Sequence, residues 1–214
     1  ISKNKVSRLS IIGDVKQILR QIIANSTIES ARELVSTEFI ETETEDITIN
    51  DWLDKINMWK ELYPLSVPVT NNNLSPQEVI NQIGLAMPNA YYTTDVGQHQ
   101  MWAAQFIKCG PRKWLSSSGL GTMGYGVPAA IGAQVAFPKE SIICISGDSS
   151  FQMNLQELGT ISQYQLPIKI FVINNHWQGM VRQWQESFYE KRYSHSNMEK
   201  GAPDLLKLGE AYNI

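Results

Sequence analysis

The chain has 214 residues, of which 43% are hydrophobic and 18% charged, and its formal net charge at pH 7 is -3. This composition is typical of a globular protein that buries a sizeable core in one or two domains. The small negative charge gives no electrostatic reason to expect nucleic acid or an anionic membrane as a partner. A small anionic substrate would therefore need local positive charge.

The cysteines and the chain ends bear on the origin of the protein. Cys109 and Cys144 form no disulfide or metal-ligand spacing pattern, which is consistent with a reducing compartment. The chain begins at Ile1 and stops inside a helical pattern, 204–212, so we expect a piece of a longer protein. Its abundance of Ile, Asn and Lys suggests an AT-rich genome, which favours a plastid stroma over the alternative, a bacterial cytoplasm.

The first third of the chain contains two predicted helices. Asp14 is a plausible N-cap before apolar residues at helical spacing. A second helix is predicted over 50–63, where Pro64 breaks it. Acidic, Thr-rich residues 38–46 lie between the two and predict a solvated linker. The predicted segments are the tail of another α/β domain, 1–48, a linker helix, 49–73, and a new domain, 74–214.

In the C-terminal segment, helical patterns alternate with short apolar runs. Ser75, Pro76 and Glu78 form a capping box that begins the first helix. Apolar runs without a polar face are typical of buried parallel strands. The predicted strands are 91–94, 142–145 and 168–173, and the predicted helices are 124–136, 151–163 and 179–188. We expect an α/β fold, a doubly wound parallel sheet with flanking helices.

The residues that follow two predicted strands suit an anion and a cation. Small residues in Ser146–Ser150 would let a diphosphate approach the free N–H groups of a helix start. Asp148 would repel that diphosphate unless a cation lay between them. Asn175, after the next strand, supplies a second oxygen of the kind that Mg²⁺ prefers. The simpler alternative is that Gly147-Asp148 forms only a turn and a helix cap.

This spacing resembles a known motif. Gly147-Asp148, the helix and strand that follow, and Asn174-Asn175 resemble the diphosphate-binding motif of thiamine-diphosphate enzymes. Three further stretches, at 96–102, 119–126 and 178–185, resemble the large subunits of acetohydroxyacid (acetolactate) synthases. The resemblance extends from Ile12 to the last residue. It implies the C-terminal, thiamine-diphosphate-binding part of such a subunit, with the tail of a central FAD-binding-type domain before it.

The resemblance also implies roles for individual residues. Asp148, Asn175 and the Trp177 carbonyl would bind Mg²⁺. Met123 would hold the cofactor in a bent shape, and Trp184 with Val181 would line the substrate channel. The helical spacing by itself favours a stripe that packs into the core, and the resemblance reverses that interpretation for Trp184. The residues implied to bind the cofactor are Val96, Gly97, Gln98, His99, Gly121, Met123, Gly147, Asp148, Ser149, Ser150, Asn175, Trp177, Gln178, Gly179, Met180 and Val181.

The activity that the resemblance implies is the decarboxylation of pyruvate on thiamine diphosphate. The two-carbon product is then condensed with a second 2-keto acid, pyruvate or 2-ketobutyrate, for the synthesis of branched-chain amino acids. The resemblance further implies FAD, a homodimer or higher oligomer and a regulatory small subunit. In the family, the activating glutamate lies in an upstream domain. We therefore predict no catalytic residue in this chain, which alone should be inactive, and a structural role for Glu157.

Two alternatives remain open at this point. The first is another thiamine-diphosphate-dependent 2-keto acid decarboxylase or oxidase. The second is a non-catalytic nucleotide-binding module, because Gly119, Gly121 and Gly124 match the G-x-G-x-x-G turn of dinucleotide folds. The run before that turn, 113–115, makes a poor strand, which disfavours this second reading. Of the remaining histidines, His176 is expected on the surface and His195 has no assigned role.

Overall fold

The computed structural model describes residues 14–25, 48–68 and 74–214. The chain divides into two compact units, Ile1–Leu62 and Tyr63–Ile214. In the described residues, every helix is too short or too polar to span a bilayer. The predicted acidic linker, 38–46, lies outside the described residues, and the proposed three-segment division stays a prediction.

The first unit contains the helices α1 (Val15–Asn25) and α3 (Ile49–Leu62). The predicted cap of α1 is confirmed, because the Asp14 carboxylate accepts a hydrogen bond from the Gln17 N–H at 3.0 Å. α3 begins with a reciprocal cap: the Thr48 hydroxyl accepts from the Asp51 N–H, and the Asp51 carboxylate accepts from the Thr48 N–H at 2.7 Å. Local capping therefore sets where both helices begin.

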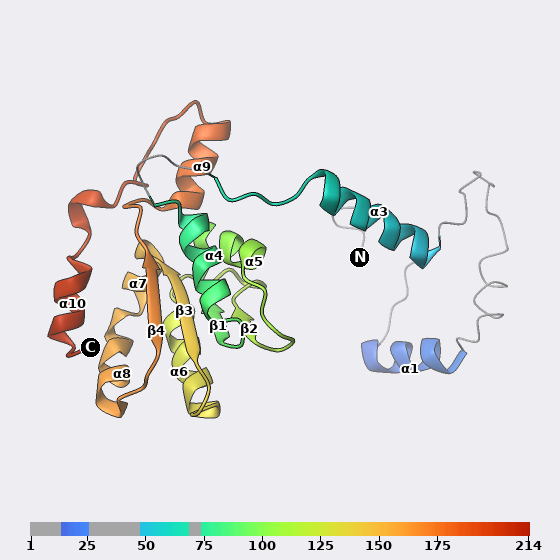
Figure 1. Cartoon of the computed structure of the whole chain (residues 1–214), viewed down its shortest axis with the longest axis horizontal. Coiled ribbons are helices and arrows are strands. Elements are labelled where there is room, and N and C mark those ends of the chain that lie inside the picture. The colour runs from blue at the N-terminus through green and yellow to red at the C-terminus, as the bar shows by residue number, and fades with distance from the viewer. Residues whose placement is uncertain (1–13, 26–47, 69–73) are drawn as a thin grey trace. The chain divides into compact units, whose positions relative to one another are not determined.

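The second unit is built on a four-stranded sheet in the order β2-β1-β3-β4, with all neighbours parallel (Figure 1). Its strands are β1 (Tyr91–Thr94), β2 (Trp114–Ser116), β3 (Ile142–Gly147) and β4 (Lys169–Ile173). The chain adds β2 on one side of β1 and then β3 on the other. The strand order therefore reverses between β1 and β3, and ligands of doubly wound sheets bind at the carboxyl ends of strands around such a point. The predicted doubly wound α/β fold is confirmed.

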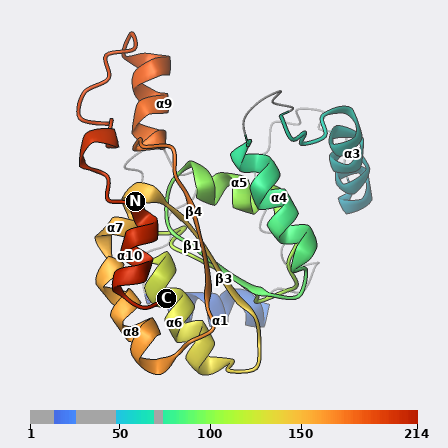
Figure 2. The same ribbon diagram turned by 60° about the vertical axis from the view of Figure 1, so that its left-hand side comes forward.

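Helices cover both faces of this sheet (Figure 2). Alternate residues of β3 enter two different cores: Ile143 and Ile145 pack on the side of α4 and α5, and Ile142 and Cys144 on the side of α6 and α8. Burial of both faces explains why the strand reads as one continuous apolar run. The helices are α4 (Pro76–Ala86), α5 (Gln98–Phe106), α6 (Gly126–Ala136), α7 (Asp148–Met153), α8 (Leu158–Tyr164), α9 (Gly179–Phe188) and α10 (Leu205–Ala211).

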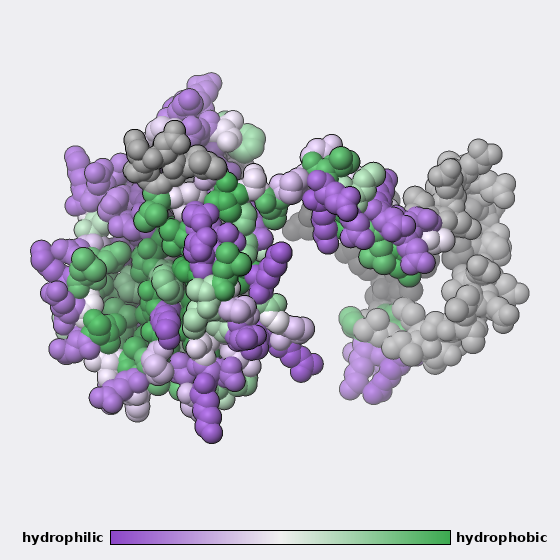
Figure 3. All heavy atoms as spheres, viewed as in Figure 1, coloured by the Kyte–Doolittle hydropathy of each residue, from purple (hydrophilic) through white to green (hydrophobic). Residues whose placement is uncertain are grey.

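The last strand and helix complete the unit. β4 is an edge of the sheet in the described residues, and Figure 3 shows hydrophobic residues gathered over the part of the surface where Figure 1 draws it. The helical pattern predicted at the C-terminal end is confirmed. Asp204 caps α10 by accepting from the Leu206 N–H at 3.1 Å, and Leu205 and Leu208 pack against the core beneath α6 and α8.

The structure corrects two predictions of local structure. The run that the sequence marks as a poor strand, 113–115, contributes to β2, which pairs with β1 through Tyr92 and Trp114. A three-residue strand carries little pattern of its own, so its partner decides its conformation. The helix α5 was also missed, although its residues belong to the 96–102 motif.

The second correction concerns the predicted helix over 151–163. The structure replaces it with α7, a 3₁₀ turn (Leu155–Glu157) and α8. The break falls at Asn154, whose side-chain amide donates to the Gly124 carbonyl at 2.8 Å. This long-range bond fastens the loop before α6 to the helix break, which a local pattern cannot reveal.

Candidate functional site

A cavity of about 240 Å³ opens at the carboxyl ends of β1 and β3. Its walls come from the segment after β1, the turn after β3, the loop before α6, and the chain from the end of β4 into α9. Every residue that the sequence predicts to bind the cofactor lines this cavity. The structure therefore brings together side chains from four distant segments, and their binding roles stay predictions.

Two lining residues were missed from the sequence, Trp102 and Ile173. Ile173 is the last residue of β4, and its place at the carboxyl end of a parallel strand was a signal that could have found it. Trp102 lies one helical turn after Gln98 in α5, and Gln98, His99 and Trp102 all line the cavity from this helix. Knowing that α5 is a helix would have predicted this position.

The glycines of the cavity are required by contacts within the protein. A Cβ on Gly147 would lie 2.8 Å from Nδ1 of His99, and a Cβ on Gly97 would lie 2.9 Å from the same atom. Gly97 also has φ 149°, a conformation that other residues rarely adopt. A Cβ on Gly179 would collide with the Gln98 side chain. The glycines therefore let α5, β3 and α9 close around the cavity.

The buried polar atoms of the cavity wall that have no hydrogen-bond partner include Oδ2 of Asp148 and Oγ of Ser149. Asp148 is 4% exposed, and burial raises the pKa of its carboxyl, while backbone N–H groups nearby oppose that rise. Buried carboxylates normally find a partner because desolvation is costly. A divalent cation at Asp148 and a phosphate oxygen at Ser149 would satisfy both atoms, so the donor set fits a metal-bound diphosphate.

The other predicted metal ligands lie in the turn after β4. The Asn175 side-chain oxygen accepts from the Trp177 N–H at 2.9 Å, with the intervening His176 left-handed at φ 58°. Trp177 also forms an isolated antiparallel bridge with Asn197, which fixes the turn. No group of three His, Cys, Asp or Glu side chains in the described parts of the chain could hold a metal. A Mg²⁺ site would therefore combine Asp148 with amide, carbonyl and cofactor oxygens.

His99 is buried beside the cavity and is neutral near pH 7. Burial lowers the pKa of its imidazole to about 4, and its Nε2 has no hydrogen-bond partner. The nearest carboxylate oxygen, Oδ2 of Asp95, is 3.8 Å away. A neutral ring cannot supply charge to a diphosphate, so its contribution at this place is its packing against Gly97 and Gly147. By contrast, His176 is exposed, as expected.

A larger groove of about 700 Å³ continues from the cavity along α9. Met180 and Val181 line both spaces, so the two are contiguous. Trp184 is 56% exposed and stands beside the Phe188 ring, with ring centroids 5.1 Å apart. No residue of α9 is buried. The alternative that Trp184 belongs to a core stripe is therefore wrong, and its position suits the predicted channel.

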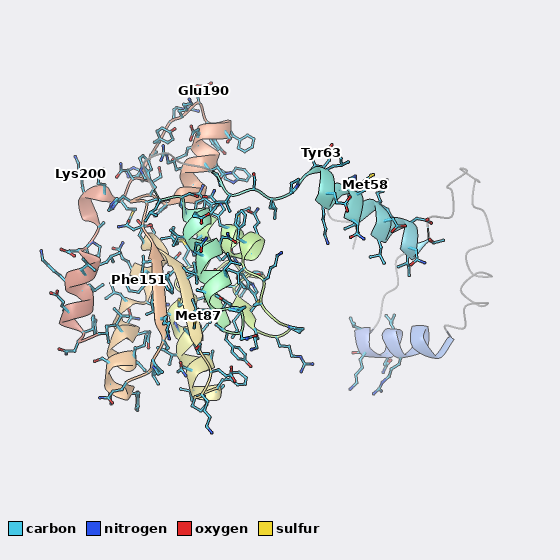
Figure 4. The ribbon with its side chains drawn as sticks, in the orientation of Figure 1. Met58, Tyr63, Met87, Phe151, Glu190 and Lys200 are labelled. Carbon is cyan, nitrogen blue, oxygen red and sulfur yellow. The ribbon has the colours of Figure 1, made fainter. Side chains whose placement is uncertain are left out.

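The groove also contains local positive charge, which a small anionic substrate of a protein with a net charge of -3 would need. Arg192 lines it and forms no ion pair within the described residues. Two successive left-handed residues, Glu190 at φ 54° and Lys191 at φ 59°, turn the chain back after α9. Figure 4 labels Glu190 at the tip of this turn. Arg182 is engaged elsewhere, since its guanidinium lies 4.4 Å from the centre of the Trp177 ring.

Comparison with known proteins agrees with this geometry. Residues 95–214 match the family described as thiamine pyrophosphate enzyme, C-terminal TPP binding domain; thiamine pyrophosphate is another name for thiamine diphosphate. The match covers more than half of the chain, and the chain belongs to this family. A solved structure, the thiamine diphosphate-dependent 4-hydroxybenzoylformate decarboxylase of Rhodococcus jostii RHA1, shares the fold. It has a TM-score of 0.60 and 23% identity, over 69% of this chain and 28% of that one.

Within that family, the chain is similar to acetolactate synthase large subunits over its whole length. It is 55% identical to the large subunit of Cyanidium caldarium over 214 residues and 47% identical to that of Parasynechococcus marenigrum. All of this chain is covered in both alignments, against 35% and 32% of the two relatives. The chain therefore spans about a third of the length of the curated relatives it matches. The dinucleotide-binding alternative is set aside by the family match, although one argument against it, the poor strand, was wrong.

Proposed function

We propose that the protein is the catalytic large subunit of an acetolactate synthase. It would decarboxylate pyruvate on thiamine diphosphate and join the two-carbon product to a second 2-keto acid, in the synthesis of branched-chain amino acids. The observation that carries the proposal is the single cavity at the switch point. It collects every residue expected to bind the cofactor and leaves Oδ2 of Asp148 without a hydrogen-bond partner.

The residues around this cavity would hold the cofactor and exclude water. Asp148, Asn175 and the Trp177 carbonyl would bind Mg²⁺, and the N–H groups at the start of α7 would face the diphosphate. Met123 would support the ring end from the loop before α6. Thiamine diphosphate supplies the electron sink for decarboxylation when bound, so the protein's own task here is orientation.

The groove beyond Met180 and Val181 would receive the 2-keto acids. Its wall is apolar through Trp184 and cationic through Arg192, which suits a small substrate with a carboxylate and a short alkyl chain. FAD, a homodimer or higher oligomer, and a regulatory small subunit belong to this proposal as well. The relatives' name, large subunit, supports a small-subunit partner. Relatives from red algae and cyanobacteria support a plastid stroma, with a bacterial cytoplasm as the alternative.

Product analysis of the full-length protein tests the proposal. The protein is incubated with pyruvate, thiamine diphosphate, Mg²⁺ and FAD, and the products are identified. Acetolactate is expected. Acetaldehyde or an acetyl product would instead place the protein among the 2-keto acid decarboxylases or oxidases. No turnover with cofactor bound would contradict any catalytic role.

A further inference from the structure

Asp95 is the residue that follows β1, and its side chain is fully buried next to the cavity without lining it. A carboxylate in that position is costly unless hydrogen bonds offset its desolvation. Burial raises the pKa of the Asp95 carboxyl, and bonds from Ser146 and from backbone N–H groups act against that rise. None of the roles assigned so far uses this residue.

One of the two carboxylate oxygens of Asp95 caps the helix α6, which is distant from Asp95 in the sequence. Oδ1 accepts from the Gly126 N–H at 2.5 Å, and α6 begins at Gly126. Tyr125, at the N-cap position, gives α6 no side-chain cap. A negative charge at a helix N-terminus is stabilising because it satisfies free N–H groups and complements the helix dipole. Asp95 therefore supplies from β1 the cap that the loop before α6 lacks.

The second oxygen reaches the neighbouring strand. Oδ2 accepts from the Ser146 hydroxyl, and the same atom lies 3.8 Å from Nε2 of His99. In the parallel register Thr94 is paired with Ile145, so Asp95 and Ser146 occupy the next position of the same ladder. One carboxylate thus connects the end of β3 with the start of α6 and lies close to the buried ring of His99.

These bonds fix the loop that forms one wall of the cavity. Gly121 and Met123 line the cavity and lie shortly before Gly126. The loop's C-terminal end is further fixed by Thr93, whose hydroxyl donates to the Gly126 carbonyl at 2.9 Å, and by the Asn154 bond to Gly124. A Cβ on Gly126 would lie 3.1 Å from the Asp95 carboxylate, so loop and carboxylate are in direct contact.

We propose that Asp95 is a positioning residue of the cofactor site: its buried carboxylate holds the loop that carries Gly121 and Met123 in place against the ends of β1 and β3. The expected effect on the affinity for thiamine diphosphate rests on the proposed function. The structural premise, that the Asp95 carboxylate helps to hold loop 117–125 in place, is independent of that function.

The test uses the full-length protein with Asp95→Asn, which keeps the shape of the side chain and removes its charge. We expect the Kd for thiamine diphosphate, with Mg²⁺ present, to rise about tenfold. Hydrogen–deuterium exchange in residues 117–125 should accelerate in the cofactor-free protein, while β3 and α8 keep their protection. Ser146→Ala is the matched control, since it removes one donor and keeps the carboxylate, and it should change the Kd no more than about threefold.

A charge relocation distinguishes positioning from general stability. Asp95→Ser combined with Ser146→Asp moves the carboxylate to the neighbouring strand at the same position of the ladder, and it should restore both the Kd and the slow exchange of 117–125. The proposal is overturned if Asp95→Asn leaves exchange in 117–125 and the Kd unchanged. It is also overturned if protection is lost throughout the domain, or if neither Asp95→Asn nor the relocated pair folds. If the wild type binds no thiamine diphosphate, the proposed function fails instead, and the exchange data still decide the structural premise.

Discussion

The contact between Gly147 and His99 gives the sharpest quantitative prediction. The change is Gly147→Ala, a single methyl group at the end of β3. Gly147 has φ −85° and ψ 153°, which alanine adopts without strain, so the backbone contributes no penalty. The new Cβ would lie 2.8 Å from Nδ1 and 3.0 Å from Cε1 of a buried, rigid imidazole. Either the ring or the strand end must therefore move.

We expect Gly147→Ala to destabilise the α/β domain by about 1–2 kcal/mol. Overpacking a tight core costs about 1–3 kcal/mol, and the smaller unfolded-state entropy of alanine offsets about 0.5 kcal/mol of that. Gly132→Ala is the matched control. Gly132 lies inside α6, and nothing comes within 4 Å of its added Cβ, so the same substitution should stabilise by about 0.5–1 kcal/mol.

The assay is native-state hydrogen exchange of β3 amides in the full-length protein, because a multidomain chain has no single free energy of unfolding. A double variant with His99→Ser should recover at least about 1 kcal/mol of the loss, since neighbours in contact are coupled. Equal stability of Gly147→Ala and the wild type would refute the steric argument. A loss that His99→Ser leaves unchanged would show that some other contact is responsible.

Three further predictions concern the charged and titratable groups of the site. Asp148→Ala should weaken Mg²⁺-dependent binding of thiamine diphosphate by at least about 100-fold, because no other group can replace the buried carboxylate as a ligand. An unchanged affinity, measured by calorimetry, would show that Asp148 is not part of the metal site. Arg192→Gln should raise the KM for pyruvate roughly tenfold, which corresponds to the loss of one charge-assisted hydrogen bond, and should have little effect on cofactor affinity. The control is Lys191→Gln, a change of the neighbouring residue, which does not line the groove and should leave the KM unaltered. Burial lowers the pKa of His99 to about 4 in the folded chain, so below pH 6.5 the unfolded chain binds a proton that the folded chain does not bind. The free energy of unfolding should therefore fall by up to about 3 kcal/mol as the pH drops from 6.5 to 4. In His99→Gln, the exchange of α5 amides, corrected for intrinsic rates, should lack that part of the pH dependence.

The sequence predicted the parts of the fold that bury apolar surface on two sides. β1 and β3 are flanked by neighbouring strands and covered by helices on both faces, so their composition alone marks them as strands. The residues after β1, β3 and β4 then converge because parallel strands end at one edge of a sheet. This geometry is why residues as far apart as Val96 and Val181 could be assigned to one site.

What the sequence missed depends on long-range partners. β2 is a strand because it pairs with β1, and the helix break at Asn154 is accompanied by a bond to the Gly124 carbonyl, 30 residues away. Asp95 was overlooked for the same reason. Read along the chain, an aspartate before Val96-Gly97 resembles an ordinary turn residue, and its importance appears only when Gly126 and Ser146 are brought to its two oxygens.

The two buried acids at the switch point show how a structure separates a positioning carboxylate from a metal ligand. Asp95 and Asp148 each directly follow a central strand, and burial raises the pKa of each. Both carboxylate oxygens of Asp95 accept hydrogen bonds, one from Gly126 and one from Ser146, so this carboxylate should bind no cation. Asp148 keeps Oδ2 buried, unpartnered and in the cavity wall. A ligand would supply the partner that this one oxygen lacks, so Mg²⁺ should lower the pKa of the Asp148 carboxyl and leave that of Asp95 nearly unchanged.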